Sequence, residues 1–237
     1  MEAKLVERKE VADRTLAFRI EPEAGPVAFE PGQVCDLKLI DPPFPDEMGD
    51  SRILSIASSP LERGLLFATR LTGSAFKRSL AEGPLGLHME VDGPYGEFTL
   101  HADVERPAVF LAGGIGITPF RGMVADIVGR KSDRQVTLVY SNRTASSVAF
   151  LDDFERWEGE DKRFRLVATL TSPKADAAWR RETGRIDRAF LERILPGNEK
   201  AIWYVVGPDA FVGAMDGLLR ETGIPPDSVR TETFAGY

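Results

Sequence analysis

A glycine-rich segment at residues 113–119, Gly-Gly-Ile-Gly-Ile-Thr-Pro, has the residue types and spacing of a phosphate-binding turn. Glycines let the backbone pass close to a pyrophosphate, and the amide groups that open the following helix point at its charge. Gly114 and Gly116 match the dinucleotide fingerprint, but Pro119 stands at its third glycine position and no acidic residue ends the next strand. The segment predicts a nucleotide site, and a tight strand–helix turn that binds no ligand is the alternative.

Two further segments are expected at the same edge of a sheet. Residues 140–143, Tyr-Ser-Asn-Arg, end the next predicted strand, and a hydroxyl with a guanidinium there can bind a 2′-phosphate, which favours NADPH over NADH. A surface arginine that caps a loop is the alternative for Arg143. Residues 205–209, Val-Val-Gly-Pro-Asp, end the fourth predicted strand, and Asp209 is expected to cap the helix that follows.

Metal-based redox chemistry is disfavoured by the composition. The 237 residues contain one cysteine, Cys35, and two histidines, His88 and His101, in no metal-ligand spacing. An iron–sulfur cluster needs about four such ligands, and a disulfide within the chain needs two cysteines. Any redox chemistry must therefore come from an organic cofactor, and no metal site is predicted.

Charge and hydropathy exclude other classes of function. The net charge is -7, so nucleic acid is an unfavourable partner. No apolar stretch reaches the roughly 18 residues that span a bilayer, and the charged N-terminus does not resemble a signal peptide. We expect a cytoplasmic protein with no membrane span.

The spacing of turn residues predicts a small antiparallel β-barrel in the first hundred residues. One helix interrupts the strands at residues 74–80, with Ser74 as its N-cap. Ala12-Asp13 is expected to form a hairpin turn between the first two strands. The predicted strands are residues 5–11, 14–20, 33–40, 52–57, 65–71, 88–91 and 98–100.

Beyond residue 107 the pattern changes to alternating strands and helices, which predicts a five-stranded parallel sheet covered on both faces. The two halves predict an antiparallel barrel domain at residues 1–103 and an α/β domain at residues 104–237. The predicted strands are residues 108–112, 136–140, 164–169, 202–206 and 229–234, and the predicted helices are residues 119–128, 148–157, 187–194 and 209–221.

Residues 52–59, Arg-Ile-Leu-Ser-Ile-Ala-Ser-Ser, resemble the R-x-Y-S-x-A-S-S flavin motif of the ferredoxin–NADP reductase superfamily. Further matches follow in the family's order over nearly the whole chain, at residues 31–33, 73–74, 93–96, 113–119, 207–208 and 232–237. The resemblance implies a flavoprotein with an N-terminal FAD-binding barrel and a C-terminal NAD(P)-binding sheet.

The resemblance also implies residue roles at the flavin. The guanidinium of Arg52 would bind the flavin pyrophosphate, the hydroxyl of Ser55 would lie near flavin N5, and the helix opened by Gly73-Ser74 would hold the phosphates. A surface ion pair is the alternative for Arg52. The expected FAD-binding set is Arg52, Ile53, Leu54, Ser55, Thr69, Arg70, Leu71, Gly73, Ser74, Ala75, Phe234 and Tyr237.

The expected nucleotide-binding set follows the glycine turn and the two strand ends. It comprises Gly114, Ile115, Gly116, Thr118, Pro119, Ser141, Asn142, Arg143, Gly207, Pro208 and Asp209. Two departures from the family pattern bear on rate. Leu54 replaces the usual aromatic residue of the flavin motif, and Val206 replaces a cysteine often found before Gly-Pro.

Ser55, Glu232 and Tyr237 are the residues expected to act in catalysis. In several branches of the family a terminal aromatic residue stacks on the flavin and moves aside for nicotinamide, which implies this role for Tyr237. A frayed tail is the alternative for Tyr237, and a solvated carboxylate is the alternative for Glu232.

The resemblance implies transfer of hydride from NAD(P)H to FAD, with the nicotinamide reaching the flavin between the two domains. Electrons would then pass to an external acceptor, expected to be a redox protein such as ferredoxin, flavodoxin or an oxygenase component. Two alternatives are an electron-transfer subunit that docks on a larger enzyme and a non-catalytic flavin or nucleotide sensor.

Overall fold

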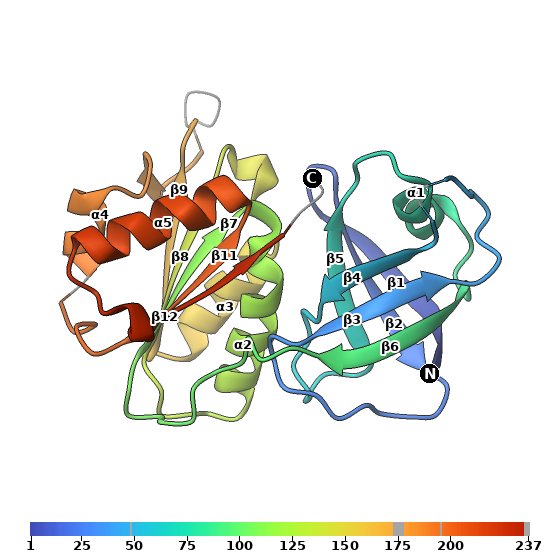
Figure 1. The fold of residues 1–237 in the computed structure, drawn as a ribbon, viewed down its shortest axis with the longest axis horizontal. Helices are drawn as coiled ribbons and strands as arrows, with labels where there is room; N and C mark the ends of the chain where they lie inside the picture. The colour runs from blue at the N-terminus through green and yellow to red at the C-terminus, as the bar shows by residue number, and fades with distance from the viewer. Residues whose placement is uncertain (48, 173–177, 195, 235–237) are drawn as a thin grey trace. The chain divides into compact units, whose positions relative to one another are not determined.

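The computed structural model describes residues 1–47, 49–172, 178–194 and 196–234. The chain forms two compact units (Figure 1). The first contains Met1–Leu100 together with Thr118–Asp126, and the second contains His101–Ile117 together with the described residues from Ile127 onward.

The first unit is a curled antiparallel sheet of six strands in the order β4-β3-β6-β1-β2-β5. After β4, the amide of Ala57 donates to the carbonyl of Leu66 in β5 at 2.7 Å, so the two ends of the sheet meet. This confirms the predicted antiparallel barrel. The strands are β1 (Glu2–Ala12), β2 (Thr15–Pro22), β3 (Val34–Leu39), β4 (Ser51–Ser55), β5 (Leu65–Arg70) and β6 (His88–Tyr95).

Alternate residues of these strands fill the interior of the barrel. Phe18 and Phe67 are directly paired across β2 and β5, and their rings stack with centroids 5.7 Å apart. The predicted hairpin is also confirmed, since Ala12 pairs with Thr15 at the turn between β1 and β2.

The strand predicted at residues 98–100 is wrong. The amide of Thr99 donates to the carbonyl of Glu97 at 2.8 Å, inside the same segment, so it does not pair with a strand. Phe98 instead places its ring 6.2 Å from that of Phe120 in α2 (Thr118–Gly129). The apolar pattern that suggested a strand comes from this side-chain packing.

Helix α1 (Ala75–Glu82) confirms the predicted helix and its cap. The side chain of Ser74 accepts from the amide of Lys77, while Phe76 and Leu80 pack into the barrel core. At the other end, the guanidinium of Arg8 donates to the carbonyls of Leu80 at 3.0 Å and Gly83 at 2.5 Å. A cation at this end stabilises the helix dipole and satisfies terminal carbonyls.

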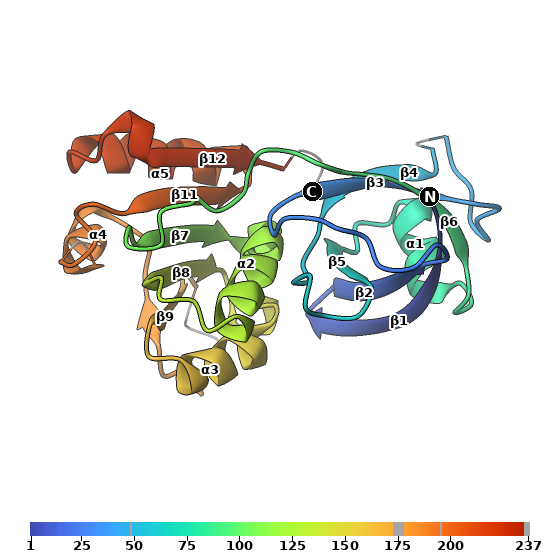
Figure 2. The same cartoon turned by 90° about the horizontal axis from the view of Figure 1, so that it is seen from below.

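The second unit is a parallel sheet in the order β10-β9-β8-β7-β11-β12 (Figure 2). All five predicted strands are present, but the predicted number of strands is wrong because the sheet has six. The extra strand, β10 (Glu182–Thr183), has two exposed residues paired with Thr169 and Leu170, so it carries no apolar pattern. The others are β7 (Ala108–Gly113), β8 (Val136–Asn142), β9 (Phe164–Leu170), β11 (Ile202–Gly207) and β12 (Val229–Thr233).

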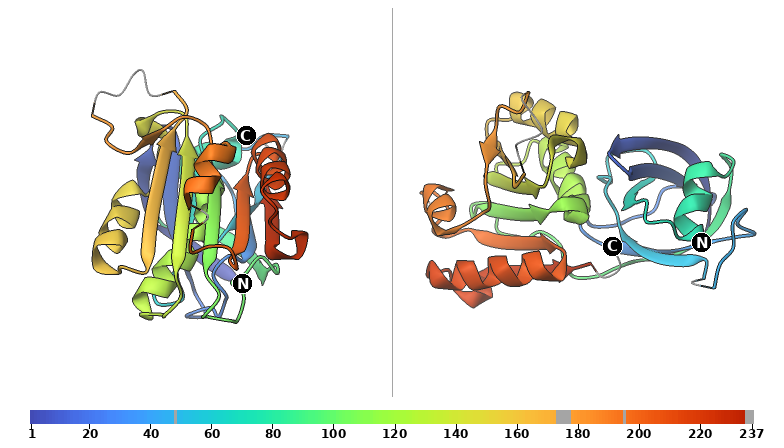
Figure 3. Two further views of the ribbon diagram at one scale, coloured as in Figure 1. Left: turned by 90° about the vertical axis from the view of Figure 1, so that its left-hand side faces the viewer. Right: turned by 90° about the horizontal axis from the view of Figure 1, so that it is seen from above.

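Helices cover both faces of this sheet, as its buried strands require. Helix α3 (Leu151–Glu160) lies on one face, and α4 (Arg188–Ile194) and α5 (Asp209–Glu221) lie on the other (Figure 3). The expected cap of α5 is corrected: Pro208 is the N-cap, and Asp209 is the first helical residue. A carboxylate at this position still interacts favourably with the positive end of the helix dipole.

A buried polar cluster joins residues at the amino ends of β7 and β11. The amide of His101 donates to the hydroxyl of Tyr204 at 2.8 Å, and that oxygen also lies 2.8 Å from Nδ1 of the same histidine. Nε2 lies 2.9 Å from the carbonyl of Arg106 and also contacts the guanidinium of Arg134. A neutral ring fits these contacts, because a protonated ring would place a second positive charge against the guanidinium of Arg134.

We expect the contribution of His101 to the free energy of unfolding to fall as the pH drops from about 7 to about 5, because the pKa of His101 is lowered by burial and further by Arg134. Below about pH 6.5 the imidazole is protonated in the unfolded chain but stays neutral in the native protein. The contribution of His101 to the free energy of unfolding is therefore present above this pH and is lost below it. Urea unfolding at several pH values measures the effect. The free energy of unfolding of the natural chain minus that of His101→Gln should fall as the pH drops through this range, whereas the same difference for substitution of the exposed His88 by Gln should not change with pH.

Candidate functional site

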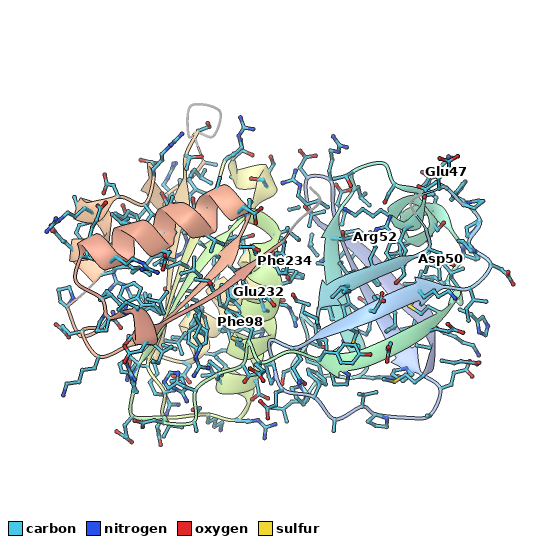
Figure 4. The ribbon with its side chains drawn as sticks, in the orientation of Figure 1. Glu47, Asp50, Arg52, Phe98, Glu232 and Phe234 are labelled. Carbon is cyan, nitrogen blue, oxygen red and sulfur yellow. The ribbon has the colours of Figure 1, made fainter. Side chains whose placement is uncertain are left out.

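Three cations gather where β4, β5 and α1 meet in the first unit. Arg52 is in β4, and its guanidinium lies 5.3 Å from the centroid of the Phe76 ring of α1 (Figure 4). Burial lowers the pKa of Lys77, and repulsion from Arg52 and Arg70 lowers it further. Nζ of Lys77 donates to the hydroxyl of Thr72 at 2.9 Å. Three like charges this close suit a ligand with several negative charges, such as a pyrophosphate.

Lys77 was missed by the sequence reasoning, although a local signal exists. It is the third residue of the helix that Ser74 caps, and its positive charge is repelled by the positive end of the helix dipole. A cation in that place is unfavourable for the helix alone. An anion bound at the helix start would reverse this effect.

A second missed residue is Asp46, in the loop before β4. One of its carboxylate oxygens accepts from the amide of Ala75 at 2.7 Å, at the start of α1. The helix start therefore holds an oxyanion from its own chain. A phosphate bound there must displace Asp46 or share the helix start with it.

Ser55, the last residue of β4, has the clearest sign of a missing partner. It is 3% exposed, and its hydroxyl makes no hydrogen bond within the described residues. A buried polar atom without a partner costs about 1–3 kcal/mol, so such groups usually have a ligand or water. The hydroxyl can donate to a heteroatom of a bound ring, as the expected contact with a flavin requires.

The other expected flavin residues fall into two groups. Leu54 and Leu71 are half-buried and pack against the barrel core, and Thr69 is buried in β5. Ile53, by contrast, is 68% exposed and shares the outer face of the sheet with Asp36.

The second half of the flavin motif has a structural role. The hydroxyl of Ser58 accepts from the amide of Leu66 at 3.0 Å, and that of Ser59 donates to Asp126 at 2.9 Å. Arg121 donates to the carbonyl of Ala57 at 3.0 Å and binds a carboxylate oxygen of Glu62 at 2.7 Å. These bonds fix the first part of α2 within the first unit.

In the second unit the glycine turn leaves β7 as a short 3-10 helix, Gly114–Ile117, before α2 begins at Thr118. Gly114 has φ of +55° and open space where a side chain would lie. At Gly116 a Cβ would lie 2.4 Å from the carbonyl oxygen of Val206. One glycine therefore supplies the left-handed conformation, and the other lets the turn pack on β11.

The carboxyl ends of the parallel strands bring the expected nucleotide residues to one sheet edge. Gly113 of β7 pairs with Ser141 of β8, and Gly207 ends the neighbouring strand β11, beside Thr233 of β12. Asn142 is 6% exposed, and its amide nitrogen makes no hydrogen bond within the described residues. Arg143 is exposed just beyond β8. This edge therefore carries an unpartnered amide donor and an exposed cation at consecutive positions.

Glu232 lies in β12, next to Val206 of β11 (Figure 4). One of its carboxylate oxygens is buried without a hydrogen-bond partner in the described part of the chain, and burial raises its pKa to about 7. A carboxyl with this pKa can hold or release a proton near neutral pH. Phe234 follows, and its amide donates to the carbonyl of Gly207 at 3.2 Å. Tyr237 lies outside the described residues.

We expect Glu232→Gln to be more stable than the natural chain above pH 7, by about 2 kcal/mol. Burial raises the pKa of Glu232 from 4.5 to about 7. The contribution of this carboxyl to the free energy of unfolding is therefore fully present below about pH 4.5 and is lost as the pH rises to about 7. Urea unfolding from about pH 5 to about pH 8 should show this loss only when Glu232 is present. The matched control is substitution of the exposed Glu221 by Gln, and equal profiles for both variants would contradict the effect of burial.

Comparison with known proteins identifies the class. Residues 110–216 match the model of the oxidoreductase NAD-binding domain. The chain is 30% identical over 237 residues to a flavohemoprotein of Deinococcus radiodurans, covering 97% of this chain and 58% of that protein. It is 26% identical to the phenol hydroxylase P5 protein of Acinetobacter pittii, covering 98% of this chain and 65% of that one. The chain therefore spans less than two thirds of these curated relatives.

Solved structures give the same fold. The FAD/NAD binding domain of nitric oxide dioxygenase from Vibrio cholerae superimposes with a TM-score of 0.84 at 20% identity, covering 98% of both chains. The Amycolatopsis cytochrome P450 reductase GcoB gives 0.83 at 27% identity, covering all of this chain and 71% of that one. The chain therefore carries an oxidoreductase NAD-binding domain and has the two-domain fold of its neighbours in the ferredoxin–NADP reductase and flavohemoprotein family, whose members are NAD(P)H-linked flavin oxidoreductases.

Within the described residues, no helix has the length and apolar character to cross a membrane. The same residues contain no cluster of histidine, cysteine, aspartate and glutamate that could hold a metal ion.

Proposed function

We propose that this chain is an NAD(P)H-dependent reductase that binds FAD and passes electrons to an external redox protein. The observation that carries the proposal is the flavin half-site of the first unit. It combines the cations Arg52, Arg70 and Lys77 with the unpartnered hydroxyl of Ser55. When bound, FAD would accept a hydride from NAD(P)H and release the electrons singly or in pairs.

The protein's own residues bind and orient in this proposal. The three cations hold the pyrophosphate, and Ser55 donates a hydrogen bond to the reactive part of the flavin. The glycine turn, with Asn142 and Arg143, holds the nicotinamide nucleotide. Hydride transfer needs the two reacting atoms about 3–3.5 Å apart, so orientation is the main contribution to rate. Glu232 holds a proton near neutral pH.

The acceptor is proposed to be a ferredoxin, a flavodoxin or an oxygenase component. Support comes from the relatives' names, which include a phenol hydroxylase protein and a cytochrome P450 reductase. The same names favour a second candidate, an electron-transfer subunit that docks on a larger enzyme. A chain that binds flavin but does not reduce it would instead be a sensor.

The experiment is steady-state oxidation of NADPH and of NADH by the FAD-loaded protein, with ferricyanide and then with a ferredoxin as acceptor. We expect oxidation that requires both FAD and an acceptor. Rapid reduction of ferricyanide without reduction of any tested protein would favour the second candidate, an electron-transfer subunit that docks on a larger enzyme. No oxidation with either nucleotide, in protein that holds FAD, would favour the sensor.

Arg143→Ala tests the proposed preference for NADPH. A guanidinium on a 2′-phosphate is worth about 1.5–3 kcal/mol, so we expect KM for NADPH to rise about 10- to 100-fold while KM for NADH hardly changes. Arg165→Ala, at an exposed position of β9, is the matched control. An unchanged ratio of the two KM values would show that Arg143 is only a surface residue.

A further inference from the structure

The outer face of the barrel strands β4, β3, β6 and β1 carries an unusual arrangement of charge. Asp36 of β3 lies directly opposite Asp92 of β6, and Glu90 of β6 lies directly opposite Glu2 of β1. Like charges directly opposed across strands destabilise a sheet. Two such pairs on one face therefore lower the free energy of unfolding.

Hydroxyl groups, rather than cations, lie beside the first pair. Ser51 donates to Asp36, and Asp92 lies close enough to the phenol of Tyr95 to raise the pKa of that phenol. A hydroxyl donor leaves the negative charge in place, so both carboxylates still project their field into solvent. The charge is therefore available to attract a partner.

Cations on this face are few and already paired. At the outward positions of these strands, Lys38 lies 3.7 Å from Glu90, and Lys4 lies 2.8 Å from Glu23, among the described residues. The N-terminal ammonium of Met1 donates to the carbonyl of Val91, between Glu90 and Asp92, at 2.7 Å. Among the described residues, no ion pair joins a cation to Asp36 or Asp92, whereas Glu90 is balanced in part by Lys38. The face as a whole is acidic, in a chain whose net charge is -7.

Apolar surface accompanies the charge. Ile53 is 68% exposed and pairs with Asp36, while Tyr95 is 45% exposed and lies near Asp92. Apolar contact with a charged rim is typical of protein interfaces. We call this set the acidic face: Glu2, Asp36, Ile53, Glu90, Asp92 and Tyr95.

We propose that the acidic face receives the electron acceptor, and that this acceptor is a redox protein with lysine and arginine around its redox centre. The inference rests on the proposed function and names the partner of its site. Ile53 stands in β4 between Arg52 and Leu54, so a partner that covers it is seated on the strand that carries the flavin motif. Opposite charges would also steer the encounter and speed association.

The test uses cytochrome c, a lysine-rich haem protein, as the probe. Binding to the FAD-loaded protein is measured by calorimetry, and its reduction is followed by absorbance, at salt from about 10 mM to about 150 mM. Asp36→Asn with Asp92→Asn should raise Kd about tenfold at low salt and flatten the salt dependence. Its melting temperature should not fall, because a repulsive pair is removed.

The matched control is Glu10→Gln with Asp13→Asn, the same loss of two charges at the β1–β2 hairpin. Its Kd should change less than about twofold, so an equal effect of both double variants would mean that only net charge matters and would overturn the proposal. Tighter binding of an acidic ferredoxin than of cytochrome c would also overturn it. If the first variant does not fold, Glu2→Gln with Glu90→Gln tests the same face.

Failure of the proposed function would look different. Anaerobic reduction of bound FAD by NAD(P)H needs no acceptor, and it should be the same in both double variants. If the natural chain shows no such reduction, the proposed function fails. If reduction is normal and the acidic face does not affect binding of cytochrome c, only the docking proposal fails.

Discussion

Arg52→Ala is expected to weaken FAD binding about 100-fold, the largest effect of any single side chain in the first unit. The guanidinium is held by the carbonyls of Gly49 at 3.2 Å and Ser51 at 2.5 Å, close to Lys77. Two charge-assisted bonds to a pyrophosphate contribute about 3 kcal/mol, which equals this loss. Equilibrium dialysis against FAD measures Kd directly.

Two controls separate charge from geometry at this position. Arg52→Lys keeps the charge but loses the planar fork, so we expect an intermediate Kd. Arg63→Ala removes an exposed arginine that pairs with Glu21, and it should leave FAD binding unchanged. If Arg52→Ala keeps its melting temperature and binds FAD as tightly as the natural chain, the pyrophosphate lies elsewhere.

Gly116→Ala is expected to destabilise the second unit by about 3 kcal/mol and to abolish measurable nucleotide binding. The added Cβ would lie 2.4 Å from the carbonyl oxygen of Val206 and 2.8 Å from Cα of Gly207. Backbone atoms cannot move aside as a side-chain end can, so the turn and β11 must separate. Urea unfolding and titration with NADPH and NADH measure the two effects.

Gly217→Ala is the matched control for this substitution. Gly217 lies within α5, where a Cβ would meet nothing within 4 Å. Alanine should therefore stabilise that helix by about 0.5–1 kcal/mol and leave nucleotide binding unchanged. Unaltered nucleotide binding by Gly116→Ala would contradict the role given to the glycine turn.

Local signals predicted most of the fold. The apolar run of β7, the glycines after it and the Ser74 cap each act within a few residues, so the sequence shows them directly. Strand β10 lacked such a signal because its two residues are exposed. The strand predicted at residues 98–100 was wrong because the ring of Phe98 packs on Phe120 and the segment pairs with no strand.

The site was predictable where the family motif names a residue and less so where tertiary contact decides. Arg52 and Ser55 follow from the motif, whereas Lys77 and Asp46 matter because the fold brings them to the start of α1. The buried, unpartnered amide of Asn142 likewise appears only in three dimensions. The roles of individual residues, and the domain boundary at residues 103 and 104, stay predictions.

The most direct test of the central claim is anaerobic reduction of the FAD-loaded protein in a single turnover. NADPH or NADH is mixed with the protein, and the visible absorbance of the flavin is followed in time. We predict that the absorbance is lost, and more slowly when the transferred hydrogen of the nucleotide is deuterium. Protein that cannot be loaded with FAD, or bound FAD whose absorbance neither nucleotide changes, would contradict the account.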